Sequence, residues 1–240
     1  MRAVWRLARL VPHVLHGLWI VRRRFELLTA TERHQLIQWW SLKTLRILGI
    51  RLQAQGQALP DGHLLVANHV SWLDIAAVHA VLPQARFVSK ADVRHWPLVG
   101  TLVEGAGTLF IERESKRDAL RVVHQTAAAL QAGDCVAVFP EGTTGTGPEL
   151  LPFHANLLQA AVSTGAPVLP VVLRWHEPGE RFSTAAQFVG GTTLAQSLWR
   201  IASARGLAID VQILPAVDCE GRDRRALGEA LRSAIAARLG

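Results

Sequence analysis

The stretch Leu64-Leu65-Val66-Ala67-Asn68-His69-Val70-Ser71-Trp72-Leu73-Asp74 joins a short apolar run to a histidine and an aspartate five residues apart. Four consecutive apolar residues predict a strand that is buried on both faces. A carboxylate that accepts a hydrogen bond from one imidazole nitrogen fixes the tautomer and leaves the other nitrogen free as a base. The stretch therefore predicts a strand that ends at a base suited to a hydroxyl substrate.

The spacing of His69 and Asp74 is weak support when it is taken alone. Ten histidines and eight aspartates occur in 240 residues, so chance placement gives roughly a third of one such pair. A histidine packed in the core is the other interpretation of His69. Other parts of the sequence are needed to distinguish a catalytic base from a chance pair or a core histidine.

The composition describes a folded chain with one strongly basic end. Half of the 240 residues are hydrophobic, which excludes disorder and allows one domain with a sizeable core. The formal charge of +7 is concentrated in residues 1–51, which hold ten Arg or Lys against two Glu. Cys135 and Cys219 match no metal-ligand spacing, and Cys135 sits in an apolar run that predicts a buried thiol.

The first 24 residues combine a basic stripe with large apolar side chains. The stripe has helical spacing and consists of Arg2, Arg6, Arg9, His13 and His16. The remaining surface is apolar and includes Trp5 and Trp19, which indicates a helix lying in a membrane interface, with a kink expected at Pro12. A spanning helix is disfavoured because no run of about 18 apolar residues occurs, and no signal-peptide cleavage site follows.

A second helix is predicted from the capping-box pattern Thr29-Ala30-Thr31-Glu32. We therefore expect residues 1–55 to form two amphipathic, membrane-associating helices in front of a domain that spans residues 56–240. One alternative is that both helices only pack on that domain. Nucleic-acid binding fits poorly, because the basic positions alternate with large aliphatic residues and no nucleic-acid motif is present.

Short apolar runs alternate with helical patterns after residue 62, which predicts an α/β fold with a mixed, largely parallel sheet flanked by helices. The predicted strands are Leu64–Ala67, Arg86–Ser89, Thr108–Ile111, Cys135–Phe139, Val168–Arg174 and Ile209–Leu214. The predicted helices are Asp74–Leu82, Ser115–Gln131, Ala155–Thr164 and Arg222–Leu239. Residues 174–187 are predicted as an irregular connection.

Polar residues follow three of these strands. Asn68–Asp74 follows the first, Arg113 follows the third, and Pro140–Gly145 follows the fourth. Functional residues of such sheets gather at the carboxyl ends of the strands. Two of these segments also have a simpler interpretation, a solvated charge run for Arg113 and an ordinary turn for Glu141-Gly142. Because all three segments follow strand ends, we expect them to line one cleft.

Taken together, these segments resemble the glycerolipid acyltransferase family, whose best-known members are the 1-acylglycerol-3-phosphate acyltransferases. The four blocks that carry the resemblance occur in the family's order. They are Asn68-His69-Val70-Ser71-Trp72-Leu73-Asp74, Gly107-Thr108-Leu109-Phe110-Ile111-Glu112-Arg113, Phe139-Pro140-Glu141-Gly142-Thr143-Thr144 and Val168-Leu169-Pro170-Val171. Phe87-Val88-Ser89-Lys90 between the first two blocks is similar to the family's basic segment.

The resemblance implies transfer of a fatty acyl group from acyl-CoA or acyl-carrier protein to the free hydroxyl of a lysolipid. His69 would be the general base and Asp74 would orient it, without an acyl-enzyme on Ser71. The remaining site residues implied are Lys90 and Arg113 for the acceptor phosphate, and Glu141, Gly142 and Thr143 for the acceptor. No metal or bound cofactor is expected, and the implied location is the cytoplasmic face of the inner membrane, peripheral or monotopic.

The sequence departs from the family at Thr144, where many members with phosphate-bearing acceptors have an arginine. This departure weakens the case for lysophosphatidate and leaves other lysolipids, such as lyso-ornithine lipid, as alternative acceptors. A catalytically inert membrane-binding protein of the same fold is disfavoured because His69 and Asp74 are both present. A hydrolase using Ser71 lacks the Gly-x-Ser-x-Gly turn, and no spacing of ligand residues supports a metal site.

Overall fold

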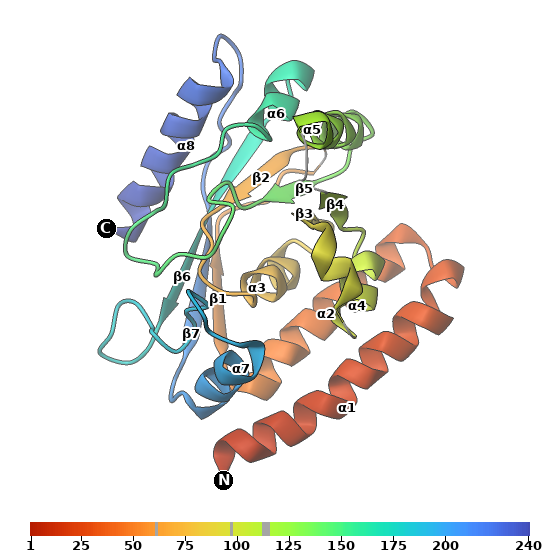
Figure 1. The fold of residues 1–240 in the computed structure, drawn as a ribbon, viewed down its shortest axis with the longest axis vertical. Helices are drawn as coiled ribbons and strands as arrows, with labels where there is room; N and C mark the ends of the chain where they lie inside the picture. The colour runs from red at the N-terminus through yellow and green to blue at the C-terminus, as the bar shows by residue number, and fades with distance from the viewer. Residues whose placement is uncertain (61, 97, 112–115) are drawn as a thin grey trace.

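A computed structural model of the protein describes residues 1–60, 62–96, 98–111 and 116–240 (Figure 1). Its described part contains one seven-stranded sheet in the order β1-β7-β6-β2-β5-β3-β4. The strands are β1 (Arg51–Gln55), β2 (Leu64–Ala67), β3 (Arg86–Lys90), β4 (Leu109–Ile111), β5 (Val136–Val138), β6 (Val168–His176) and β7 (Ala208–Ile213). All neighbouring strands are parallel except β6 and β7. The prediction of a mixed, largely parallel sheet is therefore confirmed.

Helices cover both faces of the sheet, as Figure 1 shows. The longer ones are α1 (Arg2–Arg23), α2 (Ala30–Leu48), α3 (Asp74–Val81), α5 (Lys116–Gln131), α7 (Leu194–Ser203) and α8 (Arg224–Leu239). The shorter ones are α4 (Val99–Gly105), α6 (Leu158–Thr164), η1 (Phe25–Leu27) and η2 (Ala91–His95). Residues of α1, α2, α3 and α7 pack in one core layer, and those of α5, α6 and α8 in the other.

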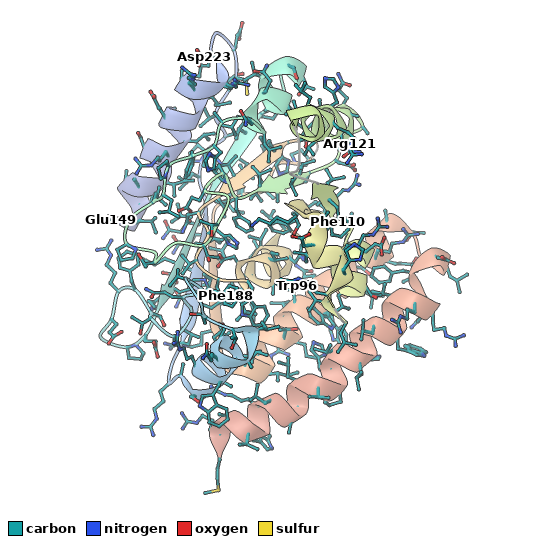
Figure 2. All side chains as sticks on the ribbon, viewed as in Figure 1. Trp96, Phe110, Arg121, Glu149, Phe188 and Asp223 are labelled. Carbon is teal, nitrogen blue, oxygen red and sulfur yellow. The ribbon has the colours of Figure 1, made fainter. Side chains whose placement is uncertain are left out.

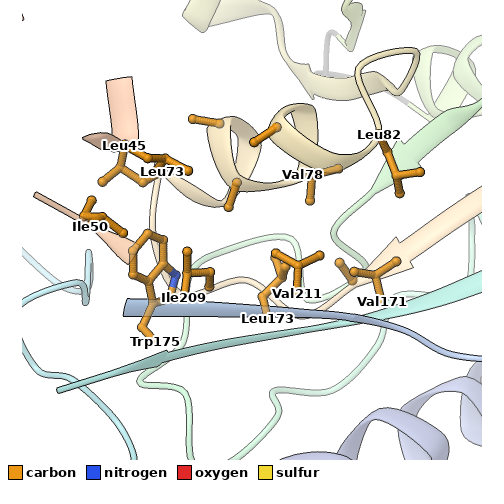
Figure 3. Close-up of a cluster of buried hydrophobic side chains, with 14 of the residues drawn as sticks. Leu45, Ile50, Leu73, Val78, Leu82, Val171, Leu173, Trp175, Ile209 and Val211 are labelled. Atoms are coloured by element: carbon orange, nitrogen blue, oxygen red, sulfur yellow. The ribbon is translucent and has the colours of Figure 1, made fainter. Parts of the chain in front are cut away.

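Strand β2 lies in the interior of the sheet, between β5 and β6. All four of its residues are fully buried, as the continuous apolar run predicts. Side chains of β6 alternate between the two layers. Leu173 and Trp175 lie on the α3 side (Figure 3), and Val172 packs in the layer of α5, α6 and α8. Burial of each such side chain stabilises the fold by roughly 1.5–3 kcal/mol relative to exposure. The tight core holds the carboxyl end of β2 in place.

Several elements lie outside the sequence-based predictions. Strand β1, which the expected division at residue 55 places with the N-terminal helices, pairs in parallel with β7 at the edge of the sheet. Its sequence is mostly polar because an edge strand is largely exposed, so no apolar run marks it. Helices α4 and α7 were not predicted, and β6 extends to His176 instead of ending at Arg174.

Helix α1 packs on α2, α4 and α7, and it continues through Pro12 as one helix. The structure divides the expected cationic stripe. The Arg6 guanidinium donates to the carbonyl oxygens of Ala202 and Ala204, both at 3.0 Å. His13 is buried and stacks on an indole of α2. Arg6 and His13 therefore bond to neighbouring parts of the protein, whereas Arg2, Arg9 and His16 of the same stripe are exposed.

In the described parts of the chain, no helix combines the length and the hydropathy that are needed to cross a bilayer.

Candidate active site

The site begins where β2 ends, and Asn68 shapes that end. Its side-chain amide donates to the Leu173 carbonyl oxygen at 2.9 Å and accepts from the Leu173 backbone nitrogen at 2.8 Å. The side chain thus replaces the backbone in the pairing with β6. Because the Asn68 side chain pairs with the backbone N–H and C=O of Leu173, the main chain after Asn68 is free to turn away from the sheet and enter α3.

His69 and Asp74 meet at this turn. The Nδ1 atom of His69 lies 2.8 Å from Oδ2 of Asp74, with side chains 18% and 0% exposed, respectively. A carboxylate only accepts, so in the neutral imidazole Nδ1 carries the proton and Nε2 keeps its lone pair. The imidazole stacks on Phe139, with ring centroids 3.9 Å apart and planes within 8°. These contacts fix the ring and leave Nε2 as the basic atom.

Asp74 accepts hydrogen bonds from the surrounding loop and from β6. Its Oδ2 accepts from the backbone nitrogens of Val70 at 2.7 Å and Ser71 at 2.9 Å. Its Oδ1 accepts from the indole nitrogen of Trp175 at 2.6 Å. Asp74 is also the first residue of α3, where the helix dipole favours an anion. Together these donors stabilise a fully buried carboxylate.

Glu141 links the loop after β5 to the turn after β2. Its Oε1 accepts from the backbone nitrogen of His69 at 2.7 Å, and its Oε2 accepts from that of Leu151 at 2.8 Å. Burial raises the pKa of Glu141, an effect that these two hydrogen bonds oppose. Both oxygens are thus engaged within the protein. The prediction that Glu141 binds the acceptor stays a prediction, and its described contacts are structural.

The loop after β5 closes over the same turn. Gly142 has a φ of 71°, a left-handed conformation that favours glycine, and its nitrogen donates to Phe139. Gly145 donates to the carbonyl oxygen of His69 at 2.7 Å. Thr143 is exposed, whereas the hydroxyl of Thr144 donates to the carbonyl of Phe188, a residue labelled in Figure 2. The structure thus brings the first and third sequence blocks together.

The two expected phosphate-binding cations follow β3 and β4. Lys90 ends β3 and is exposed, and β3 pairs with β5, the strand that carries the Glu141 loop. Arg113 lies outside the described residues. No group of three or more His, Cys, Asp or Glu suited to a metal is found in the described ranges.

Sequence reasoning missed three contributors to this site. Trp175 was placed in an irregular connection, and Asn68 and Phe139 received no role. A signal for Trp175 does exist, because the apolar alternation of β6 continues through Leu173 to this residue. No local signal pairs Trp175 with Asp74, since 101 positions separate them.

Comparison with known proteins agrees with the blocks in the sequence. The family model described as Acyltransferase matches residues 51–174. A Neisseria gonorrhoeae protein named 1-acyl-sn-glycerol-3-phosphate acyltransferase is 40% identical over 79% of this chain and 74% of its own. A Pseudomonas aeruginosa protein named lyso-ornithine lipid O-acyltransferase is 35% identical over 98% of this chain and 92% of its own.

The fold has a solved counterpart in the 1-acyl-sn-glycerophosphate acyltransferase PlsC of Thermotoga maritima. The two structures align with a TM-score of 0.67 and 21% sequence identity, over 98% of this chain and 96% of the other. The family model spans more than half of the chain and contains the turn from β2 into α3. This chain therefore belongs to the acyltransferase family and is an acyltransferase.

Proposed function

We propose that this acyltransferase moves a fatty acyl group from acyl-CoA or acyl-carrier protein to the free hydroxyl of 1-acylglycerol-3-phosphate, forming phosphatidate. The observation that carries the proposal is the His69–Asp74 pair at the carboxyl end of β2, at 2.8 Å. The names of the Neisseria relatives support the choice of acceptor.

The proposed reaction uses His69 as a general base. Its Nε2 takes the proton of the acceptor hydroxyl while the oxygen attacks the thioester carbonyl carbon. The tetrahedral intermediate collapses, the carbon–sulfur bond breaks, and the imidazolium returns the proton to the thiolate. Asp74 stabilises the imidazolium and holds the ring, so an acyl-enzyme and a bound cofactor are not needed.

The acceptor would lie across the ends of β2, β5 and β3. Lys90 supplies an exposed positive charge there, which suits a phosphate. Gly142 and Thr143 follow β5, and the exposed Thr143 lies next to the turn that holds His69. Arg113 remains the second proposed phosphate ligand on sequence grounds.

A second acceptor, lyso-ornithine lipid, is favoured by two observations. The Pseudomonas aeruginosa relative of that name matches nearly the whole chain. In addition, the Thr144 hydroxyl bonds to the backbone of Phe188, so this position supplies a loop contact and no positive charge.

We expect purified protein supplied with radiolabelled acyl-CoA to convert 1-acylglycerol-3-phosphate faster than lyso-ornithine lipid or lysophosphatidylethanolamine. Thin-layer chromatography of the extracted lipids measures the product. A second test is the variant Lys90→Gln, which should raise the KM for the phosphate-bearing acceptor by roughly tenfold, as expected for one charge-assisted contact. Product formed from lyso-ornithine lipid alone would overturn the proposed acceptor.

We also propose that the protein binds the cytoplasmic face of the inner membrane through the outer face of α1. This outer face is defined by five large apolar side chains at helical spacing, each more than half exposed. They are Val4, Trp5, Val11, Leu15 and Trp19. Arg9 lies over the Trp5 ring at 4.3 Å, and exposed arginines follow at the carboxyl end of the helix. Tryptophans with flanking cations suit the headgroup region of an anionic bilayer.

Replacing Trp5, Leu15 and Trp19 with glutamine should reduce binding to vesicles that contain anionic lipid by roughly two orders of magnitude, at about 1 kcal/mol or more for each residue. These side chains point outward, so the fold should survive. Co-sedimentation measures binding, and Leu120→Gln on α5 is the matched control, an exposed leucine on the other helical layer. Unchanged sedimentation of the triple variant would contradict the membrane assignment.

A further inference from the structure

The indole of Trp175 contacts the carboxylate that orients the proposed base. Its Nε1 donates to Oδ1 of Asp74 at 2.6 Å, and the two residues are 2% and 0% exposed. Figure 3 shows the ring among Leu73, Ile50 and Ile209 in the core between β6, β7 and the helices. A large, buried ring has little rotational freedom, so the N–H is held in a fixed direction.

The two oxygens of Asp74 are anchored on different sides. Oδ2 faces His69 Nδ1 and the loop nitrogens of Val70 and Ser71, whereas Oδ1 faces the indole of β6. Rotation of the carboxylate away from His69 would break the bond to Trp175. The indole therefore acts at a distance from the substrate, through the orientation and the charge of Asp74.

We propose that Trp175 is a positioning residue for acyl transfer: its indole N–H holds the Asp74 carboxylate toward His69 and disperses the negative charge of that carboxylate. The inference rests on the proposed role of His69 as general base. Trp175 lies outside the four sequence blocks.

Loss of the indole N–H should change the pH dependence of acyl transfer. His69 Nδ1 and Asp74 Oδ2 share a hydrogen bond of 2.8 Å, so a change in the charge of the carboxylate acts on the imidazole. When the imidazole is neutral, a hydrogen-bond donor on Asp74 stabilises the full negative charge of the carboxylate. When the imidazole is protonated, the imidazolium already offsets that negative charge, so the same donor stabilises the pair less. Removing the indole N–H should therefore raise the proton affinity of the pair. The acidic limb of kcat/KM, which reports the base in the free enzyme, should move to higher pH.

The test is Trp175→Phe, which removes the donor and keeps an aromatic ring. We expect the acidic limb to move up by roughly half a pH unit and kcat to fall by roughly three- to tenfold, with KM for the lysolipid changed by less than about twofold. Trp72→Phe is the matched control. The Trp72 indole donates to the hydroxyl of Ser197 at 3.0 Å, so this variant loses the same kind of bond without touching Asp74, and its limb should stay in place.

A second variant removes the donor without changing the shape of the ring. Benzothienylalanine, placed at position 175 alone, has sulfur in place of the N–H and keeps the size of the ring. An effect of this variant therefore cannot come from a cavity. The same variant serves as the test if the Trp175→Phe protein fails to fold. A limb that stays in place in this variant would overturn the inference and leave the His69 base intact. A wild-type profile without an acidic limb would instead contradict the base itself, and the inference with it.

Discussion

Replacing His69 with alanine should lower kcat/KM for acyl transfer by roughly 10²–10⁴-fold, the range that a positioned general base contributes. The acceptor hydroxyl would then have to lose its proton to water. The protein should remain folded, because the side chain is partly exposed at the rim of the site and, among the residues that the structure describes, makes one side-chain hydrogen bond, to Asp74. Release of free thiol from acyl-CoA, with a saturating acceptor, measures the rate.

The matched control for this prediction is His124→Ala, because His124 is an exposed histidine on α5. That variant should keep the rate of the wild type. Turnover close to wild type in His69→Ala would show that another group removes the proton. An inactive variant that also loses its circular dichroism signal would show that His69 serves the fold.

Replacing Asp74 with asparagine should lower kcat by roughly 10²–10⁴-fold, because the imidazolium formed in the reaction loses its counter-charge. The change also affects the fold. Four donors face the carboxylate, from His69, Val70, Ser71 and Trp175. An amide presents an NH2 group to at least one of them, so the free energy of unfolding should fall by about 1–3 kcal/mol.

Steady-state kinetics and urea unfolding of the same Asp74→Asn preparation separate these two effects. The control is Asp210→Asn on β7, which removes a carboxylate that pairs with Arg174 at 2.7 Å, outside the His69 turn. It should lose some stability and keep its kcat. An Asp74→Asn protein that is less stable yet turns over at the wild-type rate would limit Asp74 to a structural role.

Much of the fold was predictable from local patterns. The run Leu64–Ala67 is apolar at every position, and it forms a strand that is buried on both faces. Helix α2 begins at the predicted capping box, in which Thr29 and Glu32 bond reciprocally. Strand β1 was not predicted, because its side chains are mostly exposed and its place is set by pairing with β7.

The face that α1 turns outward was not predictable for a physical reason. The helix has apolar residues on two sides, one packed on the protein and one exposed. Periodicity reports that such residues recur, but it does not say which side meets a neighbour. The contacts of Arg6 and His13 depend on α7 and α2, and α7 itself lies 170 or more positions away in the chain.

The sequence by itself determined the contacts within the turn from His69 to Asp74. Their spacing, and the hydrogen bonds from Val70 and Ser71, arise within a few residues because one turn of chain brings these atoms together. The four ordered blocks also identified the acyltransferase family. Tertiary structure alone decided which distant groups support the turn. The turn contacts Trp175 and Glu141, and Asn68 contacts Leu173, only because β6 and β5 flank β2 in the sheet. No local sequence pattern specifies this order of strands.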